Sequence, residues 1–405
     1  MISNKMQRHR FILFSIQREG TVTVSFLAKY LGVSERTIRR DLNDLEGIGR
    51  VKCFYGGAEV IRDAEFKLFS GDETSPYKNM KINNNPLKKM DALMSEKNKK
   101  NGKVFVLGSF NTDLVYRIAN LFTLGQTIQA TNCYCLPGGK GSNQAIASVM
   151  AEAKTNFAVK LGDDEFAKRA MQFLKGVAFE QLITFEGKNC STGSAVVMVS
   201  ENEGDNAIVI NPGANQLITD EDVISCYASI SESDVFLTQM ENNFSAIYMS
   251  LKLAKADGIQ TILNPAPWKK DVEQLLQFVD YLTPNLTEAE SIVGRKLQST
   301  DEIIIAAEEI HNKGVKNVII TLGKEGCWYY NGMLHRHFSS FTAVNIDTSG
   351  AGDAFNGAFA ARIAAGDNVE TAIIYANAFA SLAVEREGAS NMPSHSAALQ
   401  RITNS

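Results

Sequence analysis

The chain has 405 residues, 44% of them hydrophobic and 21% charged, with 30 Gly and 8 Pro. This length favours two or three domains, and the composition excludes a disordered or fibrous protein. Six Cys without framework spacing predict reduced thiols and no disulfides. No uncharged apolar run reaches the roughly 18 residues of a spanning helix, and the N-terminus lacks a signal-peptide cleavage site. We therefore expect a soluble, cytoplasmic protein with no membrane partner.

Charge is distributed unevenly along the chain. Residues 1–60 carry 10 Lys and Arg against 6 Asp and Glu, a net charge of +4; residues 61–102 carry +3, and the remaining 303 residues carry −11. This asymmetry predicts a polyanionic partner for the N-terminal part alone. Residues 61–102 are rich in Asn, Lys and Ser, which predicts a linker. The expected domains are therefore residues 1–60 and 103–405, joined by that linker.

The N-terminal residues predict a helix, a second helix, a short turn and a basic third helix. Apolar residues recur at helical spacing over 7–18 and 24–31. Gly32 supplies the turn, and Ser34 caps the third helix, SERTIRRDLNDLE. The segment RVKCFYGGAEV then alternates and turns at Gly56-Gly57, as a wing hairpin does. The exposed faces of the third helix carry four candidate DNA-contacting residues: Arg36, Thr37, Arg39 and Arg40.

This succession follows the helix-turn-helix plan, in which the basic helix enters the major groove. On pattern alone, a helical interaction module with solvated arginines is the alternative. The run GTVTVSFLAKYLGVSERTIRRDLNDLEGIGRVKCFYGGA closely resembles the winged helix-turn-helix of DeoR-type bacterial regulators. The resemblance implies operator DNA as a partner. The rest of the chain does not resemble the sugar-phosphate-sensing domain usual in that family.

From Lys103 onward, short apolar runs alternate with helical stretches. Such alternation predicts an α/β fold with a doubly wound, mainly parallel sheet, in which ligands bind at the carboxyl ends of the strands. Polar or glycine residues follow the predicted strands at these ends, namely Asn111 and Asp113, Glu241, Asn264, Asn285 and Gly323.

Two glycine-rich segments carry the candidate chemistry, and neither fits a Walker loop. In PGGKGSNQAIASVMAEAK, Lys140 and Asn143 offer donors to a ligand, and small residues over 145–153 predict a tightly packed helix. In IDTSGAGDAFNG, the glycines lead into a helix whose first N–H groups face an incoming anion. Asp353 stands beside that anion hole, where a general base for phosphoryl transfer and a simple helix cap are both compatible with the pattern.

The stretch 103–398 closely resembles the ribokinase, or PfkB, family of carbohydrate kinases from end to end. Both family signatures are present, as PGGKGSNQA and DTSGAGDAFNG. Further similar segments follow in the family's order: GSFNTD, STGSAVVMVSENEGDNAIVINPGAN, TQMENN, LNPAPW, TPNLTEAE and TLGKEG. The resemblance implies a ribokinase-like fold with a small β lid, and ATP-dependent phosphorylation of a sugar hydroxyl.

The resemblance also implies roles for individual residues. It makes Asp353 the catalytic base, next to an anion hole formed by Gly350, Ala351 and Gly352. Its sugar-binding positions are Asn111, Asp113, Gly139, Lys140, Asn143 and Glu241. Its positions for the nucleotide and Mg²⁺ are Asn285, Glu288, Thr321, Gly323, Gly326 and Asn377. Its potassium site implies Asp347 and Thr348, with contributions from Gly388 and Ser390.

The potassium site departs from the family pattern. The family usually continues GAxxSxP near its end, whereas this chain has GASNMPS, one residue shorter and without the expected Ser.

The family also pairs lid sheets across a homodimer, with residues 127–136 and 194–210 as the expected lid here. Cys133 with Cys135 and His335 with His337 alternate along strands, and we expect packing or a polar strand face rather than metal sites.

Two functions from different classes follow. One is an active kinase for a pentose, with D-ribose first and deoxyribose or a nucleoside as alternatives, whose DNA-binding domain is a regulatory attachment. The other is a transcription regulator whose non-catalytic kinase fold senses sugar. The catalytic residues favour the kinase.

Overall fold

The computed structural model describes residues 5–19, 21–47, 51–54, 56–60, 101–202 and 205–404. Contacts divide the chain into two compact units, residues 1–98 and 99–405. The predicted linker 61–102 lies outside the described residues except for its last two positions. No helix in these ranges is both long and apolar enough to cross a membrane.

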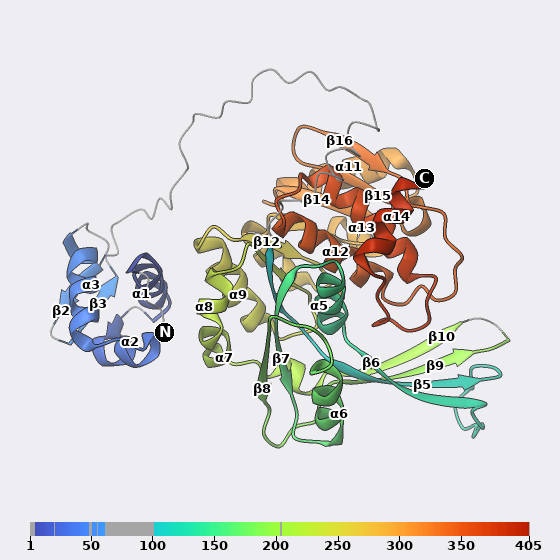
Figure 1. The fold of residues 1–405 in the computed structure, drawn as a ribbon, viewed down its shortest axis with the longest axis horizontal. Helices are drawn as coiled ribbons and strands as arrows, with labels where there is room; N and C mark the ends of the chain where they lie inside the picture. Colours follow the sequence, from blue (N-terminus) through green and yellow to red (C-terminus); the bar gives the residue numbers. More distant parts are fainter. Residues whose placement is uncertain are drawn as a thin grey trace. The chain divides into compact units, whose positions relative to one another are not determined.

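The first unit contains three helices and a small antiparallel sheet with strand order β1-β3-β2 (Figure 1). The helices are α1 (Lys5–Glu19), α2 (Val24–Leu31) and α3 (Glu35–Gly47). The strands are β1 (Thr21–Thr23), β2 (Val51–Phe54) and β3 (Gly57–Val60). The predicted helices and wing hairpin are confirmed, and β1 adds a third strand to the wing. Thr37 donates its N–H to Ser34 Oγ, which is the predicted cap.

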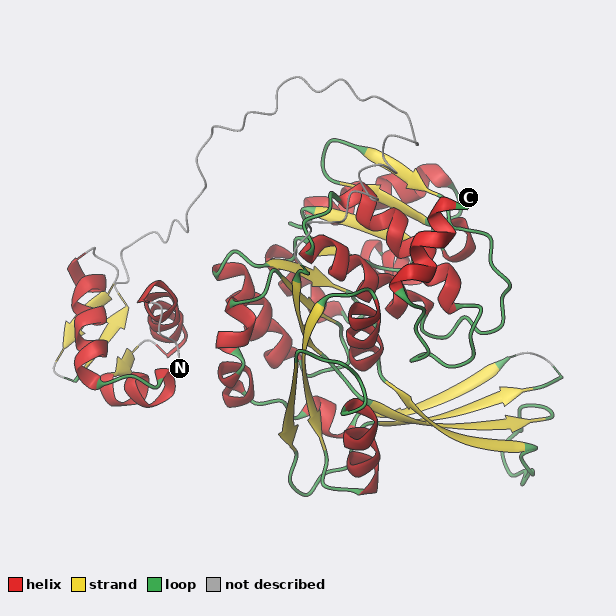
Figure 2. Ribbon diagram, viewed as in Figure 1, coloured by secondary structure: helices red, strands yellow, loops and turns green. Residues whose placement is uncertain are grey.

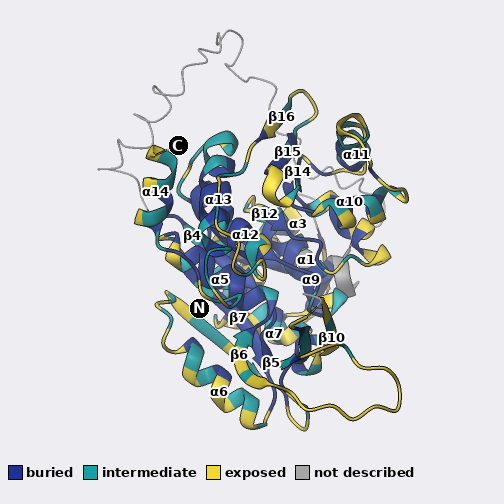
Figure 3. Cartoon of the chain, turned by 90° about the vertical axis from the view of Figure 1, so that its right-hand side faces the viewer, coloured by how far each residue is buried: buried dark blue, intermediate teal, exposed yellow. Residues whose placement is uncertain are grey.

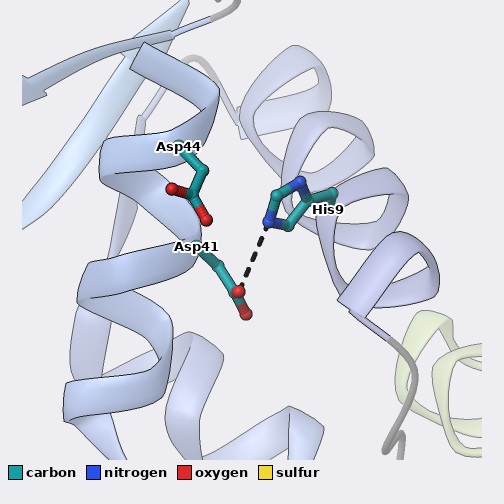
Figure 4. A group of neighbouring side chains, drawn as sticks. All are labelled: His9, Asp41 and Asp44. Atoms are coloured by element: carbon teal, nitrogen blue, oxygen red, sulfur yellow. Dashed lines mark hydrogen bonds and ion pairs between the residues drawn. The ribbon is translucent and has the colours of Figure 1, made fainter. Parts of the chain in front are cut away.

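A buried ion pair fixes α1 against α3. Asp41 is fully buried and accepts from Arg8 through both oxygens, at 2.6 and 3.2 Å. His9 Nε2 lies 3.3 Å from the same carboxylate (Figure 4), and Lys5 pairs with Asp44 at 2.7 Å. His9, Asp41 and Asp44 are the one cluster with metal-ligand proximity in the described part of the chain. Because Arg8 and Lys5 already neutralise both carboxylates, we assign this cluster a structural role.

The second unit is built on a nine-stranded sheet with the order β16-β15-β14-β13-β12-β11-β4-β7-β8. The strands from β14 to β8 in this order pair in parallel, and β15 and β16 are antiparallel. The strands are β4 (Lys103–Leu107), β7 (Lys154–Leu161), β8 (Gln181–Glu186), β11 (Val235–Thr238), β12 (Gln260–Leu263), β13 (Tyr281–Leu282), β14 (Asn317–Thr321), β15 (Cys327–Tyr330) and β16 (His335–Phe338).

Helices cover both faces of this sheet (Figure 2). Val104 and Val106 of β4 pack into one core with the buried helices α5 and α12, whereas Phe105 between them stacks on Phe236 in the opposite core. The strand therefore buries both faces, as a doubly wound sheet requires. Figure 3 shows that α5, α12 and α13 are mostly buried. The helices are α5 (Lys140–Met150), α6 (Glu165–Leu174), α7 (Asp220–Ser225), α8 (Tyr227–Ser231), α9 (Phe244–Ala256), α10 (Leu286–Val293), α11 (Thr300–Asn312), α12 (Ala351–Ala364), α13 (Val369–Ala383) and α14 (His395–Thr403).

A four-stranded lid sheet projects from this body (Figure 1), in the order β10-β9-β5-β6. Its strands are β5 (Asn111–Ile118), β6 (Asn132–Gly138), β9 (Ser194–Ser200) and β10 (Asn206–Asn211). The predicted lid segments 127–136 and 194–210 contribute strands to this sheet. The prediction was incomplete, because it left out the lid strand β5. Asn111 and Asp113 follow the core strand β4, as predicted, and both also lie at the start of the lid strand β5. All six cysteines are free, and Cys133 and Cys135 are exposed in β6.

Candidate active site

The candidate site lies where the parallel strands end. The turns after β11, β12 and β13 carry Glu241, Asn264 and Asn285, and α5 and α12 begin nearby. The close approach of these two helices depends on Gly357, because a Cβ there would lie 2.3 Å from Gln144 O. This packing brings the two glycine-rich segments together.

Asp353 lies in the first turn of α12 and is 7% exposed. Its Oδ2 accepts from Asn143 Nδ2 at 3.0 Å, and its Oδ1 accepts from Gln144 Nε2 at 2.9 Å. Both hydrogen bonds come from side-chain amides of α5, so the Asp353 carboxylate does not act as a helix cap within the described residues. The predicted base and the predicted sugar residue Asn143 are thus in direct contact.

The GAG turn has the geometry of an anion hole. Gly350 has φ +77°, and a Cβ there would lie 2.6 Å from Ala389 O, so this position needs glycine. The N–H of Ala351 donates to Thr348 O. Among the described residues, no backbone hydrogen bond uses the N–H of Gly352 or Asp353. These two donors point from a helix N-terminus, where an anion is stabilised.

The predicted sugar-binding positions lie on the lid, at the start of α5 and after β11. Glu241 Oε2 accepts from Ser109 Oγ at 2.5 Å and from the N–H of Lys140 at 3.0 Å. Asp113 lies beside Gly138, where a Cβ would stand 2.1 Å from its carboxylate. Gly139 adopts φ +91° at the cap of α5.

The Lys140 amine interacts electrostatically with four acidic residues of the candidate site. The pKa of Lys140 is raised, first by Asp353 and then by Glu241, Glu288 and Asp113. Its Nζ has no hydrogen bond or ion pair within the described ranges. The ammonium form of Lys140 is therefore favoured by the neighbouring carboxylates.

Burial raises the pKa of Asp113 to about 7, and the neighbouring charge of Glu241 adds to the shift, while Lys140 opposes it. Two carboxylates so close together cannot both stay ionised at low cost without a ligand that donates to them. Sugar hydroxyl groups are such donors.

Asn285 and Glu288 form a reciprocal capping box at the start of α10. The Asn285 N–H donates to Glu288 Oε2 at 2.9 Å, and the Glu288 N–H donates to Asn285 Oδ1 at 2.8 Å. Burial raises the pKa of Glu288. The NxxE element is therefore structural in this arrangement, and it also presents a buried carboxylate near Lys140.

The remaining predicted nucleotide positions lie around the β14–β15 turn and on α13. Thr321 ends β14 and donates its N–H to Pro284 O. Gly323 has φ +59°, and a Cβ at Gly326 would lie 1.9 Å from Phe338 O. Asn377 on α13 is buried, and its amide donates to Ser339 O at 3.3 Å, so it supports the adjacent loop.

The predicted potassium positions divide into two groups. Asp347 accepts from the N–H of Ser349 at 2.8 Å and from that of Gly388 at 3.0 Å, and Thr348 is exposed beside it. Ser390 lies elsewhere: its Oγ is 2.7 Å from Asn143 Oδ1 and 3.0 Å from Pro137 O. The shortened GASNMPS segment thus directs this hydroxyl to the sugar side.

In the N-terminal unit, Arg36, Arg39 and Arg40 are exposed on α3, and Thr37 is half-buried with its hydroxyl 3.0 Å from Ser34 Oγ. Arg39 pairs with Glu35 on the same helix at 3.1 Å. The buried face of α3 holds Ile38, Leu42 and Leu45, as the spacing predicts.

Three contributing residues were absent from the sequence prediction. Ser109 bonds Glu241, Asn215 donates to Asn111 Oδ1 at 2.9 Å, and Gln144 bonds Asp353. Ser109 follows β4 and could have been found by the strand-end rule. Asn215 lies in a short 3₁₀ turn without a comparable signal.

Both parts of the chain match known protein families. Residues 101–396 match the pfkB family carbohydrate kinases, and residues 8–64 match the DeoR-like helix-turn-helix domain. A ribokinase of Staphylococcus aureus (strain COL) is 35% identical over 289 residues, which cover 71% of this chain and 95% of that protein. A deoxyribokinase of Salmonella typhimurium is 31% identical over 286 residues, covering 70% and 93%.

Solved structures are similar as well. The ribokinase of Thermotoga maritima gives a TM-score of 0.68 at 32% identity and covers 75% of this chain and all 100% of its own. The ribokinase of Arabidopsis thaliana complexed with ribose and ATP gives 0.67 at 31% identity and covers 75% and 99%. This chain belongs to the pfkB family of carbohydrate kinases, and it carries a DeoR-like helix-turn-helix domain at its N-terminal end.

Proposed function

We propose that this chain transfers the γ-phosphoryl group of ATP to a pentose hydroxyl, with D-ribose as the first candidate. The observation that carries the proposal is the position of Asp353, which contacts Asn143 and lies beside the unused N–H groups of the GAG turn. The ribokinase of S. aureus and the Arabidopsis structure with ribose and ATP support this choice of substrates.

In the proposed reaction, Asp353 takes the proton of the sugar hydroxyl as the hydroxyl oxygen attacks the γ-phosphorus. One oxygen–phosphorus bond forms, the bond from the γ-phosphorus to the bridging oxygen breaks, and ADP leaves with that electron pair. The N–H groups of Gly352 and Asp353 stabilise the charge on the transferred group, and Lys140 adds a positive charge beside it.

The donor set around Glu288 fits Mg²⁺. Its carboxylate is buried, and no hydrogen bond reaches its Oε1 from any described residue. A hard cation prefers such carboxylate oxygens, and when bound it supplies positive charge to the phosphates. Asp347, Thr348 and Gly388 supply oxygen atoms for a potassium ion beside the GAG turn, and the two Asp347 oxygens also accept N–H groups of this loop. Ser390 does not fit that site, because its hydroxyl faces Asn143.

An ATP-consumption assay tests the proposal. The purified protein is incubated with Mg²⁺, K⁺ and each of D-ribose, 2-deoxyribose, fructose and several nucleosides. Turnover on one pentose supports the kinase and names its substrate. Sugar binding without turnover on any of them would instead support a sugar-sensing regulator.

The raised pKa of Asp113 predicts a pH-dependent sugar affinity. The ionised carboxylate accepts hydroxyl hydrogen bonds, and protonation removes that capacity as the pH falls through about 7. We expect the KM for the sugar to rise roughly tenfold for each pH unit below that pKa, and to level off above it. Initial rates measured across this pH range check the expectation. Asp113→Asn should raise KM and flatten the profile, and a wild-type profile in that variant would contradict the assignment.

We further propose that the N-terminal unit binds operator DNA. The exposed Arg36, Arg39 and Arg40 support this, since arginines at the start of a recognition helix reach bases and phosphates. Arg36→Ala is expected to weaken operator binding by roughly 1–3 kcal/mol while sugar phosphorylation stays unchanged. A gel-shift titration measures the first quantity. Arg295→Ala, an exposed arginine of the kinase unit, is the matched control and should leave DNA affinity unchanged.

We also propose a homodimer that pairs lid sheets. Edge strand β10 exposes Ile208, Val209 and Ile210 by 53%, 64% and 55%, and exposed apolar edge strands pair readily with another chain. Ile208→Lys is expected to shift the protein toward monomer in light-scattering measurements. The substitution Ile305→Lys on α11, where the side chain is 47% exposed, is the control and should not change the mass.

A further inference from the structure

The Asp353 carboxylate accepts hydrogen bonds from two side-chain amides, those of Asn143 and Gln144, whose other contacts differ. Asn143 contacts Oδ2, is bonded by Ser390 at the sugar side, and occupies a predicted sugar-binding position. Gln144, the next residue on α5, contacts Oδ1 and is completely buried. Its amide therefore reaches the base without reaching a ligand.

The orientation of the Gln144 amide is imposed by its neighbours. Its Nε2 donates to Asp353 Oδ1 at 2.9 Å and to Asn264 Oδ1 at 3.1 Å, and its Oε1 accepts from Gln239 Nε2 at 2.8 Å. Reversing the amide would turn an acceptor toward two acceptor oxygens and a donor toward a donor. All the hydrogen-bonding capacity of Nε2 is used.

The partners of Gln144 are themselves fixed by the parallel sheet. Gln239 follows β11 and Asn264 follows β12, and Asn264 Nδ2 donates to Thr283 O after β13 at 3.0 Å. Gln239 Oε1 is buried without a hydrogen-bond partner among the described residues, which is the cost of aiming its donor at Gln144. Three consecutive strand ends thus form a chain of hydrogen bonds that terminates on Asp353.

We propose, on the basis of the kinase function proposed above, that Gln144 is a positioning residue that holds the carboxylate of Asp353 toward the acceptor hydroxyl. Two donors, one on each oxygen, fix the rotation of the carboxylate about its Cβ–Cγ bond. A misplacement of reacting groups by about 1 Å can cost roughly 100-fold in rate.

The test compares Gln144→Met, which keeps the length of the side chain and removes its donors, with wild type and Asp353→Asn in full-length protein. We expect kcat to fall roughly 10–100-fold, with the KM values for sugar and ATP within about twofold of wild type. The acid limb of the kcat profile should also move to higher pH, because the charged carboxylate loses a donor. A purely structural role would not move that limb.

Ser148→Ala is the matched control. Ser148 is fully buried on the same helix and accepts a hydrogen bond from Thr155 Oγ1 at 3.0 Å, away from Asp353. It should lower the melting temperature without changing kcat or the acid limb. The same result for Gln144→Met, with wild-type kcat and acid limb, would overturn the proposal.

Gln239→Met keeps the proposal open to refutation if Gln144→Met does not fold. It removes the outer donor alone and should lower kcat by a few-fold, with a shift of the acid limb in the same direction. A folded Gln239→Met with wild-type kinetics, beside an unfolded Gln144→Met, would reduce Gln144 to a structural residue. If the wild-type protein turned over no sugar, the kinase function itself would be refuted. If Asp353→Asn lost activity while Gln144→Met kept it, only the positioning role of Gln144 would be refuted.

Discussion

Asp353→Asn is expected to lower kcat by roughly 10²–10⁴-fold, the range that a general base contributes, while sugar affinity stays within a few-fold of wild type. The substitution preserves shape but cannot take a proton from the acceptor hydroxyl. Coupled measurement of ADP release gives kcat, and calorimetric titration with D-ribose gives the affinity. Turnover equal to wild type would remove Asp353 from the role of base.

The control for this variant is Asp301→Asn. Asp301 occupies the first turn of α11, as Asp353 occupies that of α12, but it is exposed and lies in no part of the candidate site. Any helix-dipole effect of losing the carboxylate should be common to both variants. A loss of turnover confined to Asp353→Asn therefore reports chemistry rather than helix stability. Equal losses in the two variants would point to the helix.

Much of this site could be predicted because its residues lie in contiguous segments. The turn at Gly350, the donors Lys140 and Asn143, and the carboxylate of Glu241 all follow strand or helix boundaries that local patterns indicate. Such boundaries can be recognised from residue type. Gly350, for example, has a positive φ, which glycine adopts more easily than other residues. The lid was only partly predicted, because Asn111 and Asp113 directly follow a core strand and look like its end.

The parts that could not be predicted depend on tertiary distance. Neighbouring residues on a helix point in different directions, so nothing in the sequence indicates that Asn143 and Gln144 grip the same carboxylate. That contact exists because Gly357 lets α12 approach α5 closely. Ser390 is a similar case: its neighbours in sequence belong to a cation-site pattern, but the shortened loop places its hydroxyl against Asn143. Loop length, rather than residue type, decides which partner it meets.

Gly352→Val is expected to separate activity from stability. Apart from the neighbouring residues and the backbone of α12 itself, no described atom lies within 4 Å of the position of a Cβ at Gly352, so the fold has room for a side chain there. Glycine inside a helix costs roughly 0.5–1 kcal/mol relative to alanine, so replacing it should not destabilise α12. The added methyl groups would stand beside the N–H groups of Gly352 and Asp353, which we propose stabilise the phosphoryl group. We expect kcat/KM for ATP to fall roughly 10²–10³-fold, with the Tm within about 2 °C of wild type.

Gly350→Val provides the contrast, because glycine is needed at the two positions of this turn for different physical reasons. At Gly350 a Cβ would meet Ala389 O at 2.6 Å in a backbone with φ +77°, so this variant should lose stability as well as activity. Thermal melting and ATP kinetics on both variants decide the matter. If Gly352→Val retained wild-type kinetics, its N–H could not face the transferred group, and the anion hole would have to lie elsewhere. If Gly352→Val lowered the Tm as much as Gly350→Val does, glycine at position 352 would be needed for folding rather than for phosphate binding.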